Sequence, residues 1–195
     1  MAAAIAGYYE LTGWPDRPPA GPYGPYTDYL APRIVVSSLM AALEKRRETG
    51  LGEHIDLSQT ECALHYLAPA ILDQSVNGRT IQRAGNDDPS ILPHGVLPAD
   101  GNDSWLAVAC SDESRPKLAD LLGLQDLSDA NQTARREQRT IIDERLSAWS
   151  SVRDSTAAAE ELQGLGVAAY PVHDAAGTNS DPQLAHRQHQ IQVPQ

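Results

Sequence analysis

The chain has 195 residues and a hydrophobic content of 41%, which is enough for one or two domains with a buried core. Its formal net charge of −11 at pH 7 argues against nucleic acid or an anionic membrane as a partner. The opening Met-Ala-Ala-Ala-Ile-Ala lacks the basic flank of a signal peptide, no apolar run reaches the length of a membrane span, and two cysteines make no disulfide framework. We therefore expect a cytoplasmic protein in which Cys62 and Cys110 pack as small apolar residues.

The first part of the chain is predicted to be an extended connection. Residues 9–26 are rich in proline and glycine, in the runs Trp14-Pro15-Asp16-Arg17-Pro18-Pro19 and Gly21-Pro22-Tyr23-Gly24-Pro25. Proline disfavours the helical conformation in the residue that precedes it, so a regular helix is not expected here.

A long amphipathic helix is predicted over residues 32–48. Pro32 suits the first helical turn, where its missing N–H costs nothing, and Gly50 suits a left-handed stop. The apolar side chains recur at spacings of three and four and predict a helix that packs in the core through Val35, Val36, Leu39, Met40 and Leu43.

Asp28 comes just before this helix and is the first candidate functional residue. A carboxylate on a turn at a helix N-terminus is stabilised in its charged form by the helix dipole. Such a carboxylate can act as a covalent nucleophile toward an activated acyl group. The spacing alone favours the alternative that Asp28 is a turn or capping residue.

The next elements are a short strand and a second helix. Residues 53–57 alternate in polarity as a strand does, and Ser58-Gln59-Thr60-Glu61 has the spacing of a capping box. The helix is predicted over residues 59–76, with an interruption at Pro69 and an end at Asn77-Gly78.

The second half of the chain is predicted to mix strands and helices. Residues 79–98 show no periodicity and predict a loop, and residues 97–103 predict a hairpin turn around Asp100-Gly101-Asn102. A buried strand is expected at 105–110 and another strand at 167–172. Helices are expected from a cap at Asp112 to residue 122, over 155–165, and over 129–150, the last with an inward face of Ile141, Ile142, Leu146 and Trp149.

A metal site is not predicted. His186 and His189 lie three residues apart, with His173 and Asp174 upstream, but this set lacks a third fixed ligand and the groups that would orient it. The phosphate-cradling glycine patterns of nucleotide-binding proteins are also missing from the sequence.

Several runs along nearly the whole chain carry a resemblance to a known family. They are residues 10–16, Tyr26-Thr27-Asp28, residues 46–52, Ile55-Asp56-Leu57-Ser58, Pro93-His94-Gly95-Val96, and residues 166–172 and 181–187. Together they resemble the family III CoA-transferases, the CaiB/BaiF group that includes formyl-CoA, carnitine and benzylsuccinate CoA-transferases. The runs are most similar to the benzylsuccinate-transferase-like members, which hints at dicarboxylic or aromatic acids as substrates.

The resemblance implies an α/β fold from a family of interlocked homodimers. Residues 1–82 would be the central helices of a Rossmann-like large domain, and residues 83–195 a small α+β domain with a lid-like loop at 83–98. Measured against the family, the chain is a partial one that lacks the N-terminal half and the C-terminal end. It would act as a homodimer or pair with a full-length chain.

The resemblance also implies a reaction and its residues. CoA would move from an acyl-CoA donor to a carboxylic acid acceptor, with Asp28 as the nucleophile that carries the acyl group and CoA in turn. Gly85 and Asn86 would belong to the loop that covers the intermediate, and His94 would join them in binding substrate. CoA esters are then the substrates, and no metal or prosthetic group is implied.

Two alternatives remain open. One is an α-methylacyl-CoA racemase, in which the matching aspartate is an acid or base opposite a histidine. No histidine precedes Asp28 in this sequence, and Tyr29-Leu30 departs from the glycine-rich run of the racemases. The other is a non-catalytic, truncated subunit that pairs with a full-length CoA-transferase.

Overall fold

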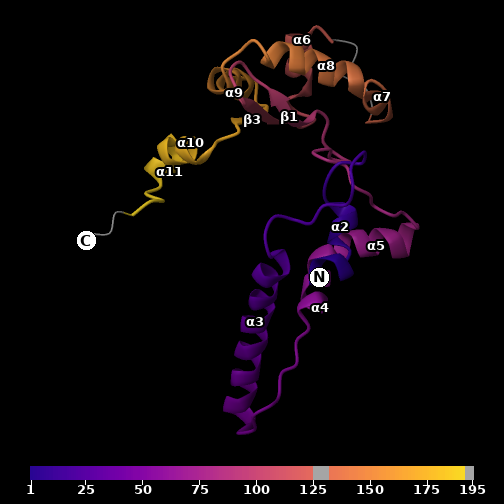
Figure 1. Cartoon of the computed structure of the whole chain (residues 1–195), viewed down its shortest axis with the longest axis vertical. Coiled ribbons are helices and arrows are strands. Elements are labelled where there is room, and N and C mark those ends of the chain that lie inside the picture. The colour runs from indigo at the N-terminus through magenta and orange to yellow at the C-terminus, as the bar shows by residue number, and fades with distance from the viewer. Residues whose placement is uncertain (125–131, 192–195) are drawn as a thin grey trace. The chain divides into compact units, whose positions relative to one another are not determined.

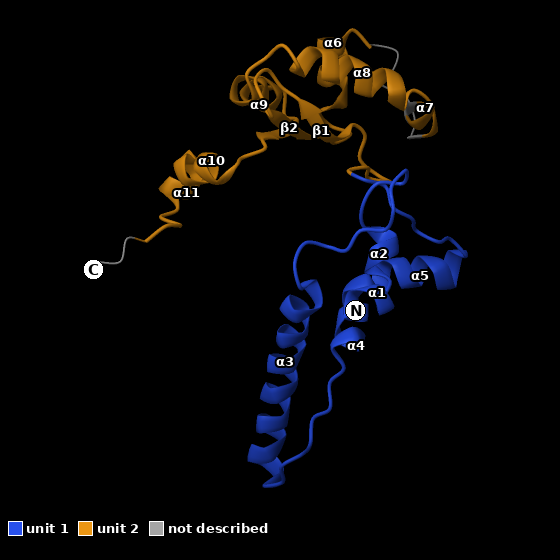
Figure 2. Ribbon diagram, in the orientation of Figure 1, with its two compact units in different colours: residues 1–85 blue, residues 86–195 orange. Residues whose placement is uncertain are grey.

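The structure, a computed structural model, describes residues 1–124 and 132–191. The chain divides into two compact units, residues 1–85 and residues 86–195 (Figure 2). The boundary expected from the sequence lay between residues 82 and 83. In the described part of the chain, no helix combines the length and the apolar character that crossing a membrane requires.

The regular secondary structure described in unit 1 consists of helices joined by loops (Figure 1). Its helices are α1 (Ala2–Ile5), α2 (Tyr8–Leu11), α3 (Tyr26–Thr49), α4 (Gln59–Leu64), a 3₁₀ turn (His65–Leu67) and α5 (Ala68–Asn77). The break between α4 and α5 confirms the interruption predicted near Pro69, which lies in the first turn of α5, where a missing N–H is tolerated. Gly50 and Gly78 end α3 and α5 in the left-handed conformation, as predicted.

Helix α3 begins six residues earlier than predicted. Pro32 therefore lies inside the helix and not in its first turn, which corrects the sequence interpretation. The helix starts at Tyr26 because its first turn packs into a small cluster formed by Ala6, Tyr8, Leu30 and Ala63, with Tyr26 against its edge. This packing compensates for the hydrogen bond that Pro32 cannot donate.

The prediction that α3 is a core helix is wrong for the chain by itself. The five side chains of the predicted apolar face are 39–59% exposed, and the buried residues of α3 are Thr27, Leu30 and Ala31 in its first two turns. The strand predicted at 53–57 is also wrong: these residues are extended and exposed, and they pair with no strand in the described part of the chain. Alternation of polarity does not make a strand without a neighbouring backbone.

Unit 2 contains a three-stranded antiparallel sheet in the order β1-β2-β3. The strands are β1 (His94–Pro98), β2 (Trp105–Ala109) and β3 (Ala168–Pro171), and Leu97 pairs with Leu106 while Val108 pairs with Ala169. The predicted hairpin and the strand at 105–110 are confirmed. Residues 94–98, which were predicted as loop, form β1 because the hairpin brings them beside β2.

Helices cover one face of this sheet. The described helices of unit 2 are α6 (Arg115–Leu122), α7 (Gln132–Glu137), α8 (Arg139–Ser150) and α9 (Ser155–Gly164), followed after β3 by α10 (Ala175–Ser180) and α11 (Pro182–His186). The core packs one face of the sheet against α6, α8 and α9, through residues such as Leu106, Val108, Leu118, Leu146, Leu162 and Val167. Cys62 in unit 1 and Cys110 in unit 2 are both buried, as predicted.

Three details of the helix predictions need correction. Helix α6 is preceded by Ser114 as its N-cap residue, whereas Asp112 pairs with Arg115 one turn along. The helix predicted over 129–150 is divided into α7 and α8 at Gln138, and its residues 129–131 lie outside the described residues. Ile142 and Leu146 face the core as predicted and Trp149 packs against it, but Ile141 is 46% exposed.

Candidate functional site

Asp28 lies in the first turn of α3 with its side chain exposed. Its backbone N–H donates to the carbonyl of Pro25 at 2.9 Å, which closes the first turn around it. The turn before it, at Gly24, has φ of +67°. The carboxylate thus stands at the positive end of the longest helix in the unit, the position that the sequence predicted for it.

The side-chain amide of Gln59 donates a hydrogen bond to Oδ1 of Asp28. Gln59 is the first residue of α4, and the N-cap residue of that helix, Ser58, accepts a hydrogen bond from the backbone N–H of Glu61 at 3.4 Å. This confirms the predicted cap at Ser58. Among residues 1–124 and 132–191, Asp28 forms no ion pair, so its partner is a neutral amide and not a cation.

A buried tyrosine links the start of α3 to the last turn of α4. The Tyr8 hydroxyl donates to the carbonyl of Ala63 in α4 at 2.9 Å, and its ring packs edge-on against Tyr26 in α3, with 5.2 Å between the ring centres. Burial raises the pKa of the Tyr8 phenol above its ordinary value, with a smaller contribution from the neighbouring tyrosines. The carboxylate of Asp28 and the amide of Gln59 therefore project from one small, fixed frame.

Gly85 is held by the loop of residues 13–20. Its N–H donates to the carbonyl of Gly13 at 2.9 Å, and its φ is +60°. A Cβ at this position would come within 2.3 Å of the Trp14 ring. The structure thus gives Gly85 a packing role in unit 1, alongside the lid role that the sequence resemblance implied.

The structure brings Asn86 and His94 together in unit 2. Nδ1 of His94 lies 2.6 Å from the carbonyl oxygen of Asn86. A carbonyl oxygen can only accept, so Nδ1 carries the proton and Nε2 is left for another partner. Asp28 and Gly85 belong to unit 1, and Asn86 and His94 to unit 2.

Comparison with known proteins then gives the family. The sequence model of CoA-transferase family III matches residues 1–195. The chain belongs to CoA-transferase family III. Its match to this family extends through both units and confirms the resemblance seen in the sequence.

Related proteins include curated CoA-transferases. The chain is 29% identical over 199 residues to the succinyl-CoA–D-citramalate CoA-transferase of Chloroflexus aurantiacus, a match that covers 99% of this chain and 49% of that protein. It is 28% identical to the succinate–glutarate CoA-transferase of Agrobacterium fabrum, covering 96% of this chain and 48% of the relative. The chain therefore spans about half the length of the curated relatives it matches.

A solved structure supports the fold. A CaiB/BaiF family protein from Brucella suis is 28% identical and superposes with a TM-score of 0.77, over 98% of this chain and 51% of that one. The mixed architecture of helices and a small antiparallel sheet is thus the one found in CaiB/BaiF proteins.

The helices leave one face of the sheet in unit 2 uncovered, and this face contains a hollow. The hollow has a volume of about 540 Å³ and is lined mostly by small side chains, with His94 and Asn86 on its border and Tyr170 and Gln163 among its other polar residues. Gln163 donates from its side chain to the carbonyl of Ala169 at 2.8 Å, which fixes its amide at the edge of β3. The lining is apolar and open and suits an uncharged group better than a phosphate.

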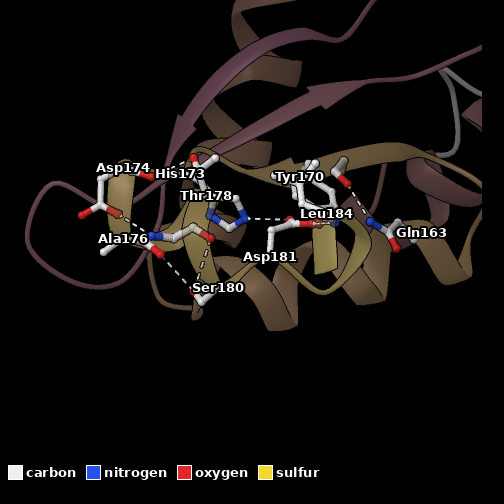
Figure 3. A network of polar contacts seen from close by, with 11 residues as sticks. Gln163, Tyr170, His173, Asp174, Ala176, Thr178, Ser180, Asp181 and Leu184 are labelled. Carbon is white, nitrogen blue, oxygen red and sulfur yellow. Dashed lines mark hydrogen bonds and ion pairs between the residues drawn. The ribbon is translucent and has the colours of Figure 1, made fainter. Parts of the chain in front are cut away.

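A second polar network surrounds Asp181, a residue to which the sequence analysis assigned no such role (Figure 3). Its carboxylate accepts from the Tyr170 hydroxyl at 2.6 Å and from the backbone N–H of Leu184 at 2.9 Å, and Nε2 of His173 lies 3.2 Å away. These hydrogen bonds, that of Tyr170 first, hold the pKa of Asp181 below its ordinary value, and the same contact raises the pKa of Tyr170.

His173 and Asp174, two of the residues considered for a metal site, make other contacts in the structure. His173 contacts Asp181, and Asp174 caps α10 by accepting from the backbone N–H of Gly177 at 2.7 Å. In the part of the chain that the structure describes, no three His, Cys, Asp or Glu side chains are grouped so as to hold a metal ion.

Sequence reasoning singled out Asp28 but not the side chain that donates a hydrogen bond to it. Gln59 was read as one residue of a capping box, and that pattern correctly placed it at the start of a helix. What the sequence does not show is that two helix starts, 31 residues apart, meet side by side.

Proposed function

We propose that this chain supplies the nucleophile and the small domain of a CoA-transferase that moves CoA from an acyl-CoA to a free carboxylic acid. The observation that carries the proposal is the exposed carboxylate of Asp28 in the first turn of α3, hydrogen-bonded to a neutral amide. Membership of CoA-transferase family III supports this reaction class. A carboxylate held in this way keeps one oxygen available for attack on an acyl carbon.

The proposed reaction begins with two displacements. A lone pair of Asp28 Oδ2 forms a bond to the acyl carbon of the donor, the C–S bond breaks, and CoA leaves as a thiolate. The thiolate sulfur then attacks Cγ of Asp28, the bond from Cγ to Oδ2 breaks, and the donor departs as a free carboxylate. Asp28 now carries CoA as a thioester.

Two further displacements complete the transfer. An oxygen of the acceptor carboxylate attacks Cγ, the C–S bond breaks, and the thiolate is released again beside a new mixed anhydride. The thiolate attacks the acyl carbon of the acceptor, whose bond to the bridging oxygen breaks. The product is a new acyl-CoA, and the Asp28 carboxylate is restored. The reaction assigns no step to a metal or prosthetic group.

The substrates are proposed to be dicarboxylic acids and their CoA esters. The names of two relatives, the succinyl-CoA–D-citramalate and succinate–glutarate CoA-transferases, name acids of this kind. Gly85 and Asn86 are proposed to line the cover of the intermediate, because exclusion of water protects an anhydride from hydrolysis. His94 is proposed to bind substrate through Nε2, since Nδ1 is occupied by Asn86.

The assembly is proposed to follow the family as well. Unit 1 would form part of a Rossmann-like large domain, and the chain would work in a dimer or paired with a full-length chain. The exposed apolar face of α3 supports a partner, because such a face is more stable when covered.

Replacement of Asp28 tests the function. The purified chain is mixed with succinyl-CoA and a free dicarboxylate, and new CoA esters are measured by chromatography, with and without a full-length family member. Asp28→Asn keeps the size and the hydrogen-bonding pattern but removes the charge, so kcat should fall roughly 10³-fold or more. Asp16→Asn, an exposed aspartate in the loop before α3, is the matched control and should keep full activity.

The possible outcomes separate the alternatives. Full activity of Asp28→Asn with unchanged circular dichroism contradicts the proposal. Turnover that appears only with the full-length chain, whether or not Asp28 of this chain is intact, supports the non-catalytic subunit. Inversion at the α-carbon of a chiral acyl-CoA, without exchange of CoA, supports the racemase.

A further inference from the structure

The side-chain amide of Gln59 donates its hydrogen bond to one particular oxygen of the Asp28 carboxylate. Nε2 donates to Oδ1 of Asp28, and among the described residues no other side chain donates to that carboxylate. Oδ2 is thereby the oxygen left open for attack. A hydrogen bond that marks one of two equivalent oxygens gives the two atoms different roles in a reaction.

The frame behind this contact is rigid on both sides. The side chain of Ser58 caps the N-terminus of α4 directly before Gln59, and Leu30 and Ala63 are buried together one turn beyond each helix start. Tyr8 joins the two helices, because its hydroxyl donates to the carbonyl of Ala63 in α4 and its ring packs against Tyr26 in α3. An exposed side chain loses less entropy in making a contact when its backbone is already held in this way.

We propose that Gln59 positions Asp28 for attack through Oδ2 and then stabilises the negative charge that develops on Oδ1 when sulfur or oxygen attacks Cγ. The inference rests on the proposed function, in which Asp28 becomes an acyl carrier. In the second and third displacements Cγ is tetrahedral and Oδ1 bears the charge. The Gln59 N–H is already in contact with that atom, so no reorganisation is needed.

A neutral donor is the better choice for this role. An arginine or lysine would hold the resting carboxylate in an ion pair and so weaken it as the nucleophile of the first displacement. An amide N–H binds the charge of an oxyanion more strongly than the neutral carbonyl oxygen of the anhydride or thioester from which it forms. The difference between the two states, and not the strength of the contact, accelerates the reaction.

Gln59→Ala should lower kcat about 10²-fold and leave KM nearly unchanged, because the lost contact acts on the reacting carboxyl and not on substrate binding. Attack on Cγ becomes slow, so when the chain is mixed with the acyl-CoA donor alone, less of the protein carries CoA at an early time point. Borohydride reduces the aspartyl thioester to an alcohol, and mass spectrometry of the peptide with Asp28 should show less of this product. Gln74→Ala, at another exposed helical glutamine of unit 1, is the matched control and should match the wild type.

Gln59→Glu gives a signature that a purely structural role would not produce. Its carboxylate repels the charge on Asp28, whereas its protonated form offers an O–H donor at the same place. The activity of this variant relative to the wild type should therefore rise about tenfold as pH falls from 8 to 5.5. Gln59→Asn, whose amide is one methylene shorter, should recover only part of the loss.

The results distinguish this inference from the function on which it rests. If Asp28→Asn abolishes transfer while Gln59→Ala keeps the wild-type kcat and the wild-type yield of reduced thioester, the role of Gln59 is overturned and the function stands. If Asp28→Asn retains full transfer, or the wild type transfers no CoA with or without a full-length chain, the function fails and the role of Gln59 fails with it.

Discussion

Gly85 shows how one residue type can be required for a reason other than chemistry. Its positive φ disfavours any side chain, and the Trp14 ring occupies the space into which a Cβ would project. Both constraints act within unit 1, on the loop that leads toward α3. A glycine that serves a lid and a glycine required for packing would respond differently to a substitution at position 85.

Gly85→Ala should displace Trp14 and lower the free energy of unfolding by about 1–3 kcal/mol, because a left-handed alanine and a steric overlap act together. The change is measured by thermal unfolding and by the position of the Trp14 indole N–H resonance. Gly52→Ala is the control, since Gly52 has no positive φ and no atom near its would-be Cβ. An indole resonance that does not move would contradict the packing role.

The pair of Asp28 and Gln59 belongs to the same scale. Each residue alone is ordinary, an aspartate in a first helical turn and a glutamine after a capping serine. The chemistry proposed for them depends on their contact, which neither the spacing nor the composition of the chain shows.

At the scale of elements, a polar contact joins α11 to β3. Asp181 is 5% exposed and joins Tyr170 of β3 to the first turn of α11 (Figure 3). The pKa of this carboxyl is lower in the folded chain than its ordinary value of 3.8. The ionised carboxylate therefore stabilises the fold at pH values above 3.8, and this stabilisation is lost as pH falls through the lower, folded pKa.

At neutral pH, Asp181→Ala should therefore destabilise α11 in the same way that acid destabilises it in the wild type. Amide exchange at Leu184 should become about tenfold faster in Asp181→Ala and less so in Asp181→Asn, since asparagine still caps a helix but lacks the charge. Hydrogen exchange followed by mass spectrometry measures the effect, with Asp120→Asn on the exposed side of α6 as the control. Unchanged exchange at Leu184 in Asp181→Ala would rule out this anchoring role.

Local signals in the sequence predicted most of these elements. Gly50, Ser58 and Gly78 end or begin helices exactly where their backbone preferences require, and the buried run at 105–110 is a strand. The failures share a cause: β1 exists because β2 lies beside it, and residues 53–57 are no strand because no strand in the described part of the chain pairs with them. The same limit hid Gln59, whose role depends on a partner 31 residues away.

At the scale of the whole molecule, the two units differ in how they are stabilised. Among the residues that the structure describes, unit 2 has twelve in its main buried cluster and unit 1 has four in its own. Helix α3, which carries Asp28, therefore extends well beyond the buried surface that its own unit offers. Most of its stability must come from helical hydrogen bonds or from a partner.

We expect the exposed face of α3 to be the surface on which this chain associates. Covering a half-exposed Val, Leu or Met contributes roughly 1 kcal/mol, and the face presents five such side chains. The wild type should therefore sediment at twice its mass of 21.0 kDa at micromolar concentration. The double variant Val36→Glu, Met40→Lys should sediment at 21.0 kDa, because its charges oppose burial.

The design of this variant keeps the helix intact. Glutamate followed four residues later by lysine forms a favourable pair on a helix surface, so the circular dichroism should be unchanged. Ala41→Glu places a charge on a different face of α3, four residues before Lys45, and should leave the association as it is in the wild type. A wild-type chain that stays at 21.0 kDa, or a double variant that still pairs, would show that this face is not the contact. Since Asp28 lies at the start of the same helix, loss of pairing together with loss of CoA transfer would link assembly to the placement of the nucleophile.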